Sequence, residues 1–273
     1  MSWRKGPNPL IEQQKIQQQL RQQRRLERLN QKRFLKDEDF PIQFELFPEE
    51  KTLNDIPKII EYFETKERLY IHQSLSRLKL LSRNLDFIEP IIQSQLPQYL
   101  IQFASSNEVL LRANSFSILA HLCASNNNQL IDKLIHEGVV KCFTSILSQP
   151  FQLKFSNLYE CSSIGIGNLL LSGDNYRQMI FSEPFLPQFL MTCQQLIPSS
   201  KNFDLLSAFA HIIANILPES FQLNVENVKQ LVPIVISFTL IIELENYEDI
   251  ISMFLKLIKY GNIQMLFHFV SLS

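Results

Sequence analysis

Three stretches of this 273-residue chain share one layout: SILAHLCASNNN (117–128), IGIGNLLLSGDN (164–175) and HIIANILPES (211–220). In each, an apolar segment of helical periodicity ends in small or polar residues, and a second apolar segment follows. His121, Asn168 and Asn215 occupy equivalent positions, 47 residues apart in both steps. An earlier copy, LSRLKLLSRN (75–84), precedes them. Units this short cannot bury their own apolar faces, so neighbouring units are expected to stack.

The repeat length and the composition together predict the fold class. A 47-residue step lies at the upper end of the armadillo and HEAT periods. The chain is 45% apolar, and its six glycines stand against 21 phenylalanines. Barrels and nucleotide-binding α/β folds use more glycine at turns. We therefore expect an all-α fold, a right-handed armadillo-type superhelical solenoid of about four repeats over residues 55–273.

The charge is divided between a basic N-terminal arm and an acidic body. Residues 1–36 hold ten basic and two acidic residues, and the remainder holds 16 basic and 25 acidic ones, which gives net charges of +8 and −9. Residues 37–54, DEDFPIQFELFPEEKTLN, carry acids and two prolines and are expected to form an extended linker. Such a division predicts attraction of the arm to an acidic partner or to the body itself.

The arm is polar, rich in glutamine and predicted to order only on a partner. Its basic residues recur along one helical flank: Arg24, Arg25, Arg28, Lys32 and Arg33. Three interpretations stay open for this flank: an unspecific solvated helix, a binding segment for a protein partner, or a segment that folds back onto the solenoid. Nucleic-acid binding is disfavoured because no aromatic residues alternate with the basic ones and the body is acidic.

The segment ECSSIGIGNLLLSGDNYRQMIF (160–181) resembles the second armadillo repeat of the importin alpha (karyopherin alpha) family, with its Gly-Asn pair and Gly-Asp turn. Residues 113–150 are similar to the repeat before it, and DIPKIIEY (55–62) with LKLLSRN (78–84) looks like the opening repeat. The arm stands where that family keeps its importin-beta-binding segment. The resemblance implies a nuclear-import adaptor, working in cytoplasm and nucleus, whose partners are importin beta and nuclear-localisation-signal cargo.

In that family, asparagine amides on a concave groove clamp the backbone of an extended basic peptide, because an amide offers both a donor and an acceptor. The resemblance assigns this role to Asn168 and Asn215, and His121 stands in the first asparagine position. The family's tryptophan positions hold Ser117, Ile164 and His211, and the chain's one tryptophan is Trp3. His121 and His211 are expected on the groove, either as ordinary side chains or as a modified clamp. The family's acidic residue follows the second asparagine by four positions. That position is Ser172 here, and Asp174 lies two positions further on.

No pattern of catalytic or metal-binding residues emerges, so we expect a protein that is not an enzyme and uses neither a cofactor nor a metal. The five histidines lack metal-ligand spacing, and no nucleophile–base arrangement is indicated. Gly165 and Gly167 lack the lysine of a phosphate-binding loop and are expected to permit close helix contact. The four cysteines are expected to be free thiols in a reducing compartment. The longest apolar stretch, 231–242, is too short to cross a bilayer.

The last residues are almost wholly apolar, and a solenoid normally ends in a polar capping repeat. We therefore expect a partner or a second copy at an apolar end formed by Leu266, Phe267, Phe269 and Val270. Two functional hypotheses remain. The first is an importin-alpha-like adaptor that binds an extended basic peptide in its groove and importin beta through its arm. The second is a structural armadillo subunit of a larger assembly that has lost cargo binding.

Overall fold

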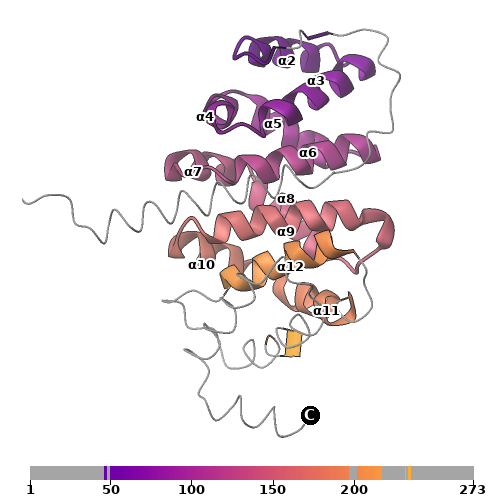
Figure 1. The fold of residues 1–273 in the computed structure, drawn as a ribbon, viewed down its shortest axis with the longest axis vertical. Coiled ribbons are helices and arrows are strands. Elements are labelled where there is room, and N and C mark those ends of the chain that lie inside the picture. Colours follow the sequence, from indigo (N-terminus) through magenta and orange to yellow (C-terminus); the bar gives the residue numbers. More distant parts are fainter. Residues whose placement is uncertain (1–45, 48–49, 197–201, 217–230, 232, 235–273) are drawn as a thin grey trace, which may run out of the picture.

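The computed structural model describes residues 46–47, 50–196, 202–216, 231 and 233–234. These residues form α-helices joined by short turns, with one short 3₁₀ helix, and the helices stack in layers along the long axis of the molecule (Figure 1). The arm and the apolar end expected above lie outside the described residues.

The helices fall into an opening pair and three triplets. The opening pair is α2 (Asp55–Glu64) and α3 (Arg68–Leu81). The triplets are α4 (Leu85–Gln93), α5 (Leu96–Ala104) and α6 (Val109–Leu122); α7 (Asn128–His136), α8 (Val139–Leu147) and α9 (Ser156–Leu170), with the 3₁₀ turn η1 (Leu153–Phe155) before α9; and α10 (Asp174–Ser182), α11 (Leu186–Leu196) and α12 (Phe203–Ile216).

Each triplet places two short helices before one longer helix, and local sequence signals explain the breaks. Asn84 and Asn127 cap α4 and α7, accepting hydrogen bonds from the backbone amides of residues 86 and 129. Gly138 takes a left-handed conformation with φ 99° between α7 and α8, which is a conformation that suits glycine. Pro97 lies in the first turn of α5, where its missing N–H costs nothing. The second apolar segment of each repeat is therefore a pair of helices.

The longer helices α3, α6, α9 and α12 form a ladder in which each lies beside the next (Figure 1). We call the outward face of these four helices the ladder face; on α3 it carries Leu69, Gln73, Ser76 and Leu80. Buried aromatic rings join the layers beneath it: Phe116 of α6 packs on Phe143 of α8 with centroids 5.8 Å apart. Phe189 of α11 meets Phe209 of α12 edge to face at 5.3 Å.

The predicted fold class is confirmed: the described chain is an all-α armadillo-type solenoid with four units. The 47-residue steps that relate His121, Asn168 and Asn215 correspond to the spacing of α6, α9 and α12. Within the described part of the chain, none of the helices is long and apolar enough to span a membrane.

Candidate functional site: a polar row along the ladder helices

The ladder helices run in the same direction, so their carboxyl-terminal ends lie along one edge of the ladder, beside α4, α7 and α10 (Figure 1). On α3, the partly or well exposed positions Leu69, Gln73, Ser76 and Leu80 follow helical spacing and mark one outward stripe. Because His121, Asn168 and Asn215 hold equivalent late positions in α6, α9 and α12, the repeat places their side chains in one line across the ladder.

Hydrogen bonds connect that line from α3 to α12. Ser82, just after α3, contacts Nδ1 of His121 through its Oγ at 2.8 Å. The Nδ2 of Asn168 donates to the backbone carbonyl of Ala120 in α6 at 3.2 Å. On its other side, Oδ1 of Asn168 lies 3.3 Å from Nε2 of His211 in α12. We call Ser82, His121, Asn168, His211 and Asn215 the polar row.

The geometry assigns the proton on the His211 ring. Since Asn168 uses its Nδ2 on Ala120, its Oδ1 faces the ring and must accept from Nε2–H. Nδ1 of His211 is then an acceptor, and Nδ2 of Asn215 lies 3.4 Å from it while donating to the His211 carbonyl at 2.7 Å. These contacts correspond to the Nε2–H tautomer of the His211 ring, which is assigned from its hydrogen-bond partners.

Four of the five polar-row residues are buried, and His211 is partly exposed. Asn168 is 1% exposed, Asn215 7%, and His121 is fully enclosed. Burial lowers the pKa of His121 to about 3, and the nearby cations of Arg83 and Lys79 add to this effect. His121 is therefore neutral at physiological pH and cannot attract or repel a ligand by charge.

Two glycines of the IGIGN stretch make the close approach of helices possible. A Cβ built on Gly167 would lie 2.4 Å from Cδ2 of His211, so the imidazole packs directly over the α9 backbone. A Cβ on Gly165 would lie 2.3 Å from Cε2 of Phe143 in α8. The expectation that these glycines permit close helix contact is therefore confirmed, and Gly167 explains why His211 can reach Asn168.

The structure brings four of the five expected groove residues together: His121, Asn168, His211 and Asn215. Asp174 is the first residue of α10 and lies outside the ladder helices, where it is exposed and paired with Arg177. Ser82 was missed by sequence reasoning because α3 precedes α6 by a shorter step than 47 residues. It also lies one residue beyond the end of α3, whereas His121, Asn168 and Asn215 lie one or two residues before the ends of their helices.

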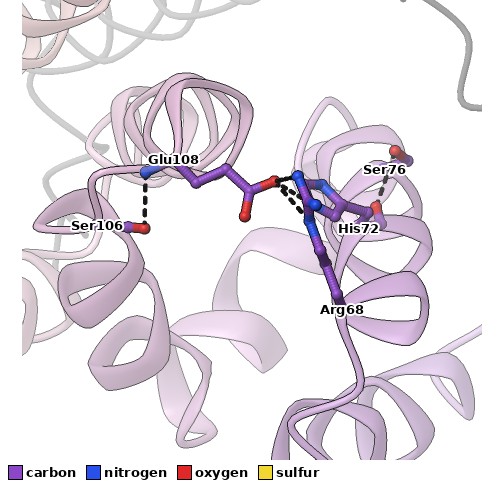
Figure 2. Close-up of polar contacts among 5 residues, drawn as sticks. All are labelled: Arg68, His72, Ser76, Ser106 and Glu108. Carbon is purple, nitrogen blue, oxygen red and sulfur yellow. Dashed lines mark hydrogen bonds and ion pairs between the residues drawn. The ribbon is translucent and has the colours of Figure 1, made fainter.

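A second polar cluster, also missed by sequence reasoning, joins α3 to α6 near the opposite ends of these helices (Figure 2). Oε1 of Glu108, the residue before α6, accepts from Nη2 of Arg68 at 2.7 Å and lies 2.6 Å from Nε2 of His72. Partial burial alone would raise the pKa of Glu108, but the hydrogen bonds from Arg68 and His72 outweigh it and hold this pKa below its ordinary value. The cluster is an electrostatic link between two ladder helices.

Among the residues that the structure describes, no group of histidine, cysteine and carboxylate side chains could hold a metal ion. Cys123, Cys142, Cys161 and Cys193 are free thiols, and all but Cys142 are fully buried. Burial raises the pKa of Cys142 to about 12 and that of Cys123 further still. Thiols held in this protonated state are poor nucleophiles.

Comparison with known proteins rests on structure alone. No protein-family model and no curated protein sequence matches the chain. Among solved structures, a designed armadillo repeat protein superposes with a TM-score of 0.62 at 15% identity, covering 77% of this chain and 85% of its own. A computationally designed armadillo protein for modular peptide recognition gives 0.60 at 14% identity, with 74% and 81% covered.

A third neighbour is a designed armadillo repeat protein in complex with the peptide (KR)4, which gives a TM-score of 0.58 at 13% identity and covers 74% of this chain and 81% of its own. Identities this low establish architecture and leave binding activity to be argued from the site. The ladder helices, the triplet layout and these superpositions agree that the chain has the armadillo-repeat fold.

Proposed function

We propose that this protein is a non-catalytic armadillo-repeat adaptor that binds an extended protein segment across its ladder face. The observation that carries the proposal is the polar row, in which Asn168, His211 and Asn215 of successive repeats form one line of amide and imidazole groups. A peptide backbone presents alternating donors and acceptors, and amide side chains can satisfy both.

For the row to bind a peptide, its internal hydrogen bonds must be exchanged for bonds to the ligand. The two bonds of Asn168 measure 3.2 and 3.3 Å, whereas an optimal N–H···O bond is about 2.9–3.0 Å. Each exchange replaces one hydrogen bond by another, so it costs little, and the net gain is the difference between the shorter bond to the peptide and the longer internal one. The row is thus closed in the free protein and opens as the peptide enters.

The finer form of the proposal is an importin-alpha-like adaptor in nuclear protein import, moving between cytoplasm and nucleus. Its groove would take a basic localisation segment, which the net charge of −9 on residues 37–273 favours by electrostatic attraction. One structural neighbour holds an alternating Lys-Arg peptide, which supports this class of ligand. The basic arm would bind importin beta.

Fluorescence anisotropy with a labelled (KR)4 peptide and the full chain tests the groove. We expect binding that weakens at least tenfold in Asn168→Ala/Asn215→Ala, because each lost amide removes hydrogen bonds worth about 1 kcal/mol or more. The matched control is Asn84→Ala, which removes an asparagine at the α4 cap, away from the row. Circular dichroism confirms that each variant remains folded. Equal binding by wild type and the double variant would exclude the row as the binding element.

The arm is tested separately in the full chain. We expect wild type to bind importin beta and a variant with alanine at Arg24, Arg25, Arg28, Lys32 and Arg33 to lose that binding. Attraction through surface cations also predicts a steep loss of wild-type binding as salt rises. If wild type does not bind importin beta at low salt, the nuclear-import form of the proposal fails while peptide binding by the ladder face stands.

A second candidate function is a structural scaffold subunit, and the burial of the same row favours it. Asn168 is 1% exposed and already hydrogen-bonded on both sides, which suits a role in holding α6, α9 and α12 in register. This function predicts no affinity for (KR)4 in a folded protein and a loss of stability when Asn168 is replaced.

A further inference from the structure

The end of the solenoid at α2 and α3 is covered by residues that precede α2. Nζ of Lys58 in α2 donates to the backbone carbonyl of Leu46 at 2.6 Å. The ring of Phe47 meets the ring of Tyr62 edge to face, with centroids 5.8 Å apart and an interplanar angle of 87°. This edge-to-face geometry is favoured by the aromatic quadrupole, so Phe47 is docked in a specific orientation.

Two cations hold the same ring. Nζ of Lys58 lies 5.3 Å from the Phe47 centroid, and Cζ of Arg77 in α3 lies 5.8 Å from it. Both distances are within the range of cation–π attraction. We call Lys58, Tyr62 and Arg77 the Phe47 clamp; it joins both helices of the opening pair to one aromatic side chain.

Arg77 is fixed by more than the ring. Its guanidinium is buried and pairs with Asp55 at the start of α2, where Nε and Nη2 each lie 2.6 Å from Oδ2. It also donates to the carbonyl of Glu50. A buried ion pair is better tolerated when its groups make further hydrogen bonds, and the bond to Glu50 is one of these. Arg77 thereby connects Phe47, the backbone at Glu50 and the first turn of α2.

The opening unit has only two helices in the described chain, whereas every later unit has three. The outer surface of this pair is a place where a further unit would stack, and solenoids need a cap at such a surface. We propose that residues 46–47 and 50–54 are the N-terminal cap of the solenoid. The Phe47 clamp holds this cap and closes the α2–α3 end to stacking by a second copy.

Hydrogen exchange on the full chain tests the cap. In Phe47→Ala we expect amides of α2 and α3 to exchange about tenfold faster, since a well-oriented aromatic anchor is lost. Lys58→Met, which keeps the aliphatic stem but removes the ammonium, is expected to give a smaller change in the same helices. The matched control is Leu53→Ala, a large apolar residue of the same cap whose side chain is 54% exposed. It should leave the exchange unchanged.

Faster amide exchange in α2 and α3 of Phe47→Ala, with exchange in α9 unchanged, supports the cap, because a cap stabilises the unit that it covers. Unchanged exchange in Phe47→Ala overturns it, and so does equal acceleration in α9, which would make Phe47 an ordinary core residue. Sedimentation velocity tests the closure of the end: Phe47→Ala should self-associate more than wild type as concentration rises. A variant that is loosened in α2 and α3 without added self-association overturns the claim that the cap prevents stacking.

Discussion

Replacing Gly165 by alanine tests whether contact between α8 and α9 is as close as the structure shows. The new Cβ would lie 2.3 and 2.4 Å from Cε2 and Cζ of Phe143, well inside van der Waals contact. Phe143 is fully buried and packs on Phe116, itself 1% exposed, so its ring has no open space into which to move. Helices α8 and α9 would have to separate.

Two opposing terms set the sign of the effect. Alanine is better than glycine inside a helix by about 1 kcal/mol. Overpacking a tight core costs about 1–3 kcal/mol, and a closest approach of 2.3 Å, which needs about 1 Å of relief, places Gly165→Ala at the upper end of that range. The expected net result is a loss of about 1–2 kcal/mol in the free energy of unfolding.

Urea denaturation followed by circular dichroism measures this loss as a lower midpoint at an unchanged slope. Shortening the obstructing side chain in Gly165→Ala/Phe143→Leu should recover part of it relative to the sum of the single variants. The control is Ser163→Ala in the same helix, which removes a buried hydroxyl with no hydrogen-bond partner and should be neutral or stabilising. A Gly165→Ala variant as stable as wild type would refute the close approach.

Three further predictions concern the polar residues. The buried His121 has a folded-state pKa of about 3, below its unfolded value, so the unfolded chain takes up the proton first as the pH falls. The free energy of unfolding should therefore be highest above about pH 6.5 and about 2 kcal/mol lower at pH 5. His121→Gln should flatten this part of a stability–pH profile. Asn168→Ala leaves the Ala120 carbonyl without its donor and should cost about 1–3 kcal/mol in urea denaturation. Glu108 should titrate below its ordinary pKa by NMR, and Arg68→Gln should raise that pKa.

The repeat architecture could be predicted from sequence because it depends on two periodicities. The helical period and the 47-residue step together place His121, Asn168 and Asn215 at equivalent positions of α6, α9 and α12. Both periodicities can be read from the sequence without knowledge of side-chain packing.

The contacts of those residues could not be predicted in the same way. Whether Asn168 faces solvent or His211 depends on how closely α9 and α12 approach, which Gly167 permits and only the packed structure reveals. The docking of Phe47 was also missed. Its segment was expected to belong to an extended linker, and the cations that hold it, Lys58 and Arg77, are 11 and 30 positions further along the chain.

The most direct test of peptide binding by the ladder face is an NMR titration of the side-chain amides of asparagine in the full chain with (KR)4. We expect the amide signals of Asn168 and Asn215 to shift on saturation, as their internal hydrogen bonds are exchanged for bonds to the peptide backbone. The signal of Asn84, which caps α4, should stay in place. A protein that binds no peptide, or that binds it while the Asn168 and Asn215 signals remain fixed, would contradict the proposed site.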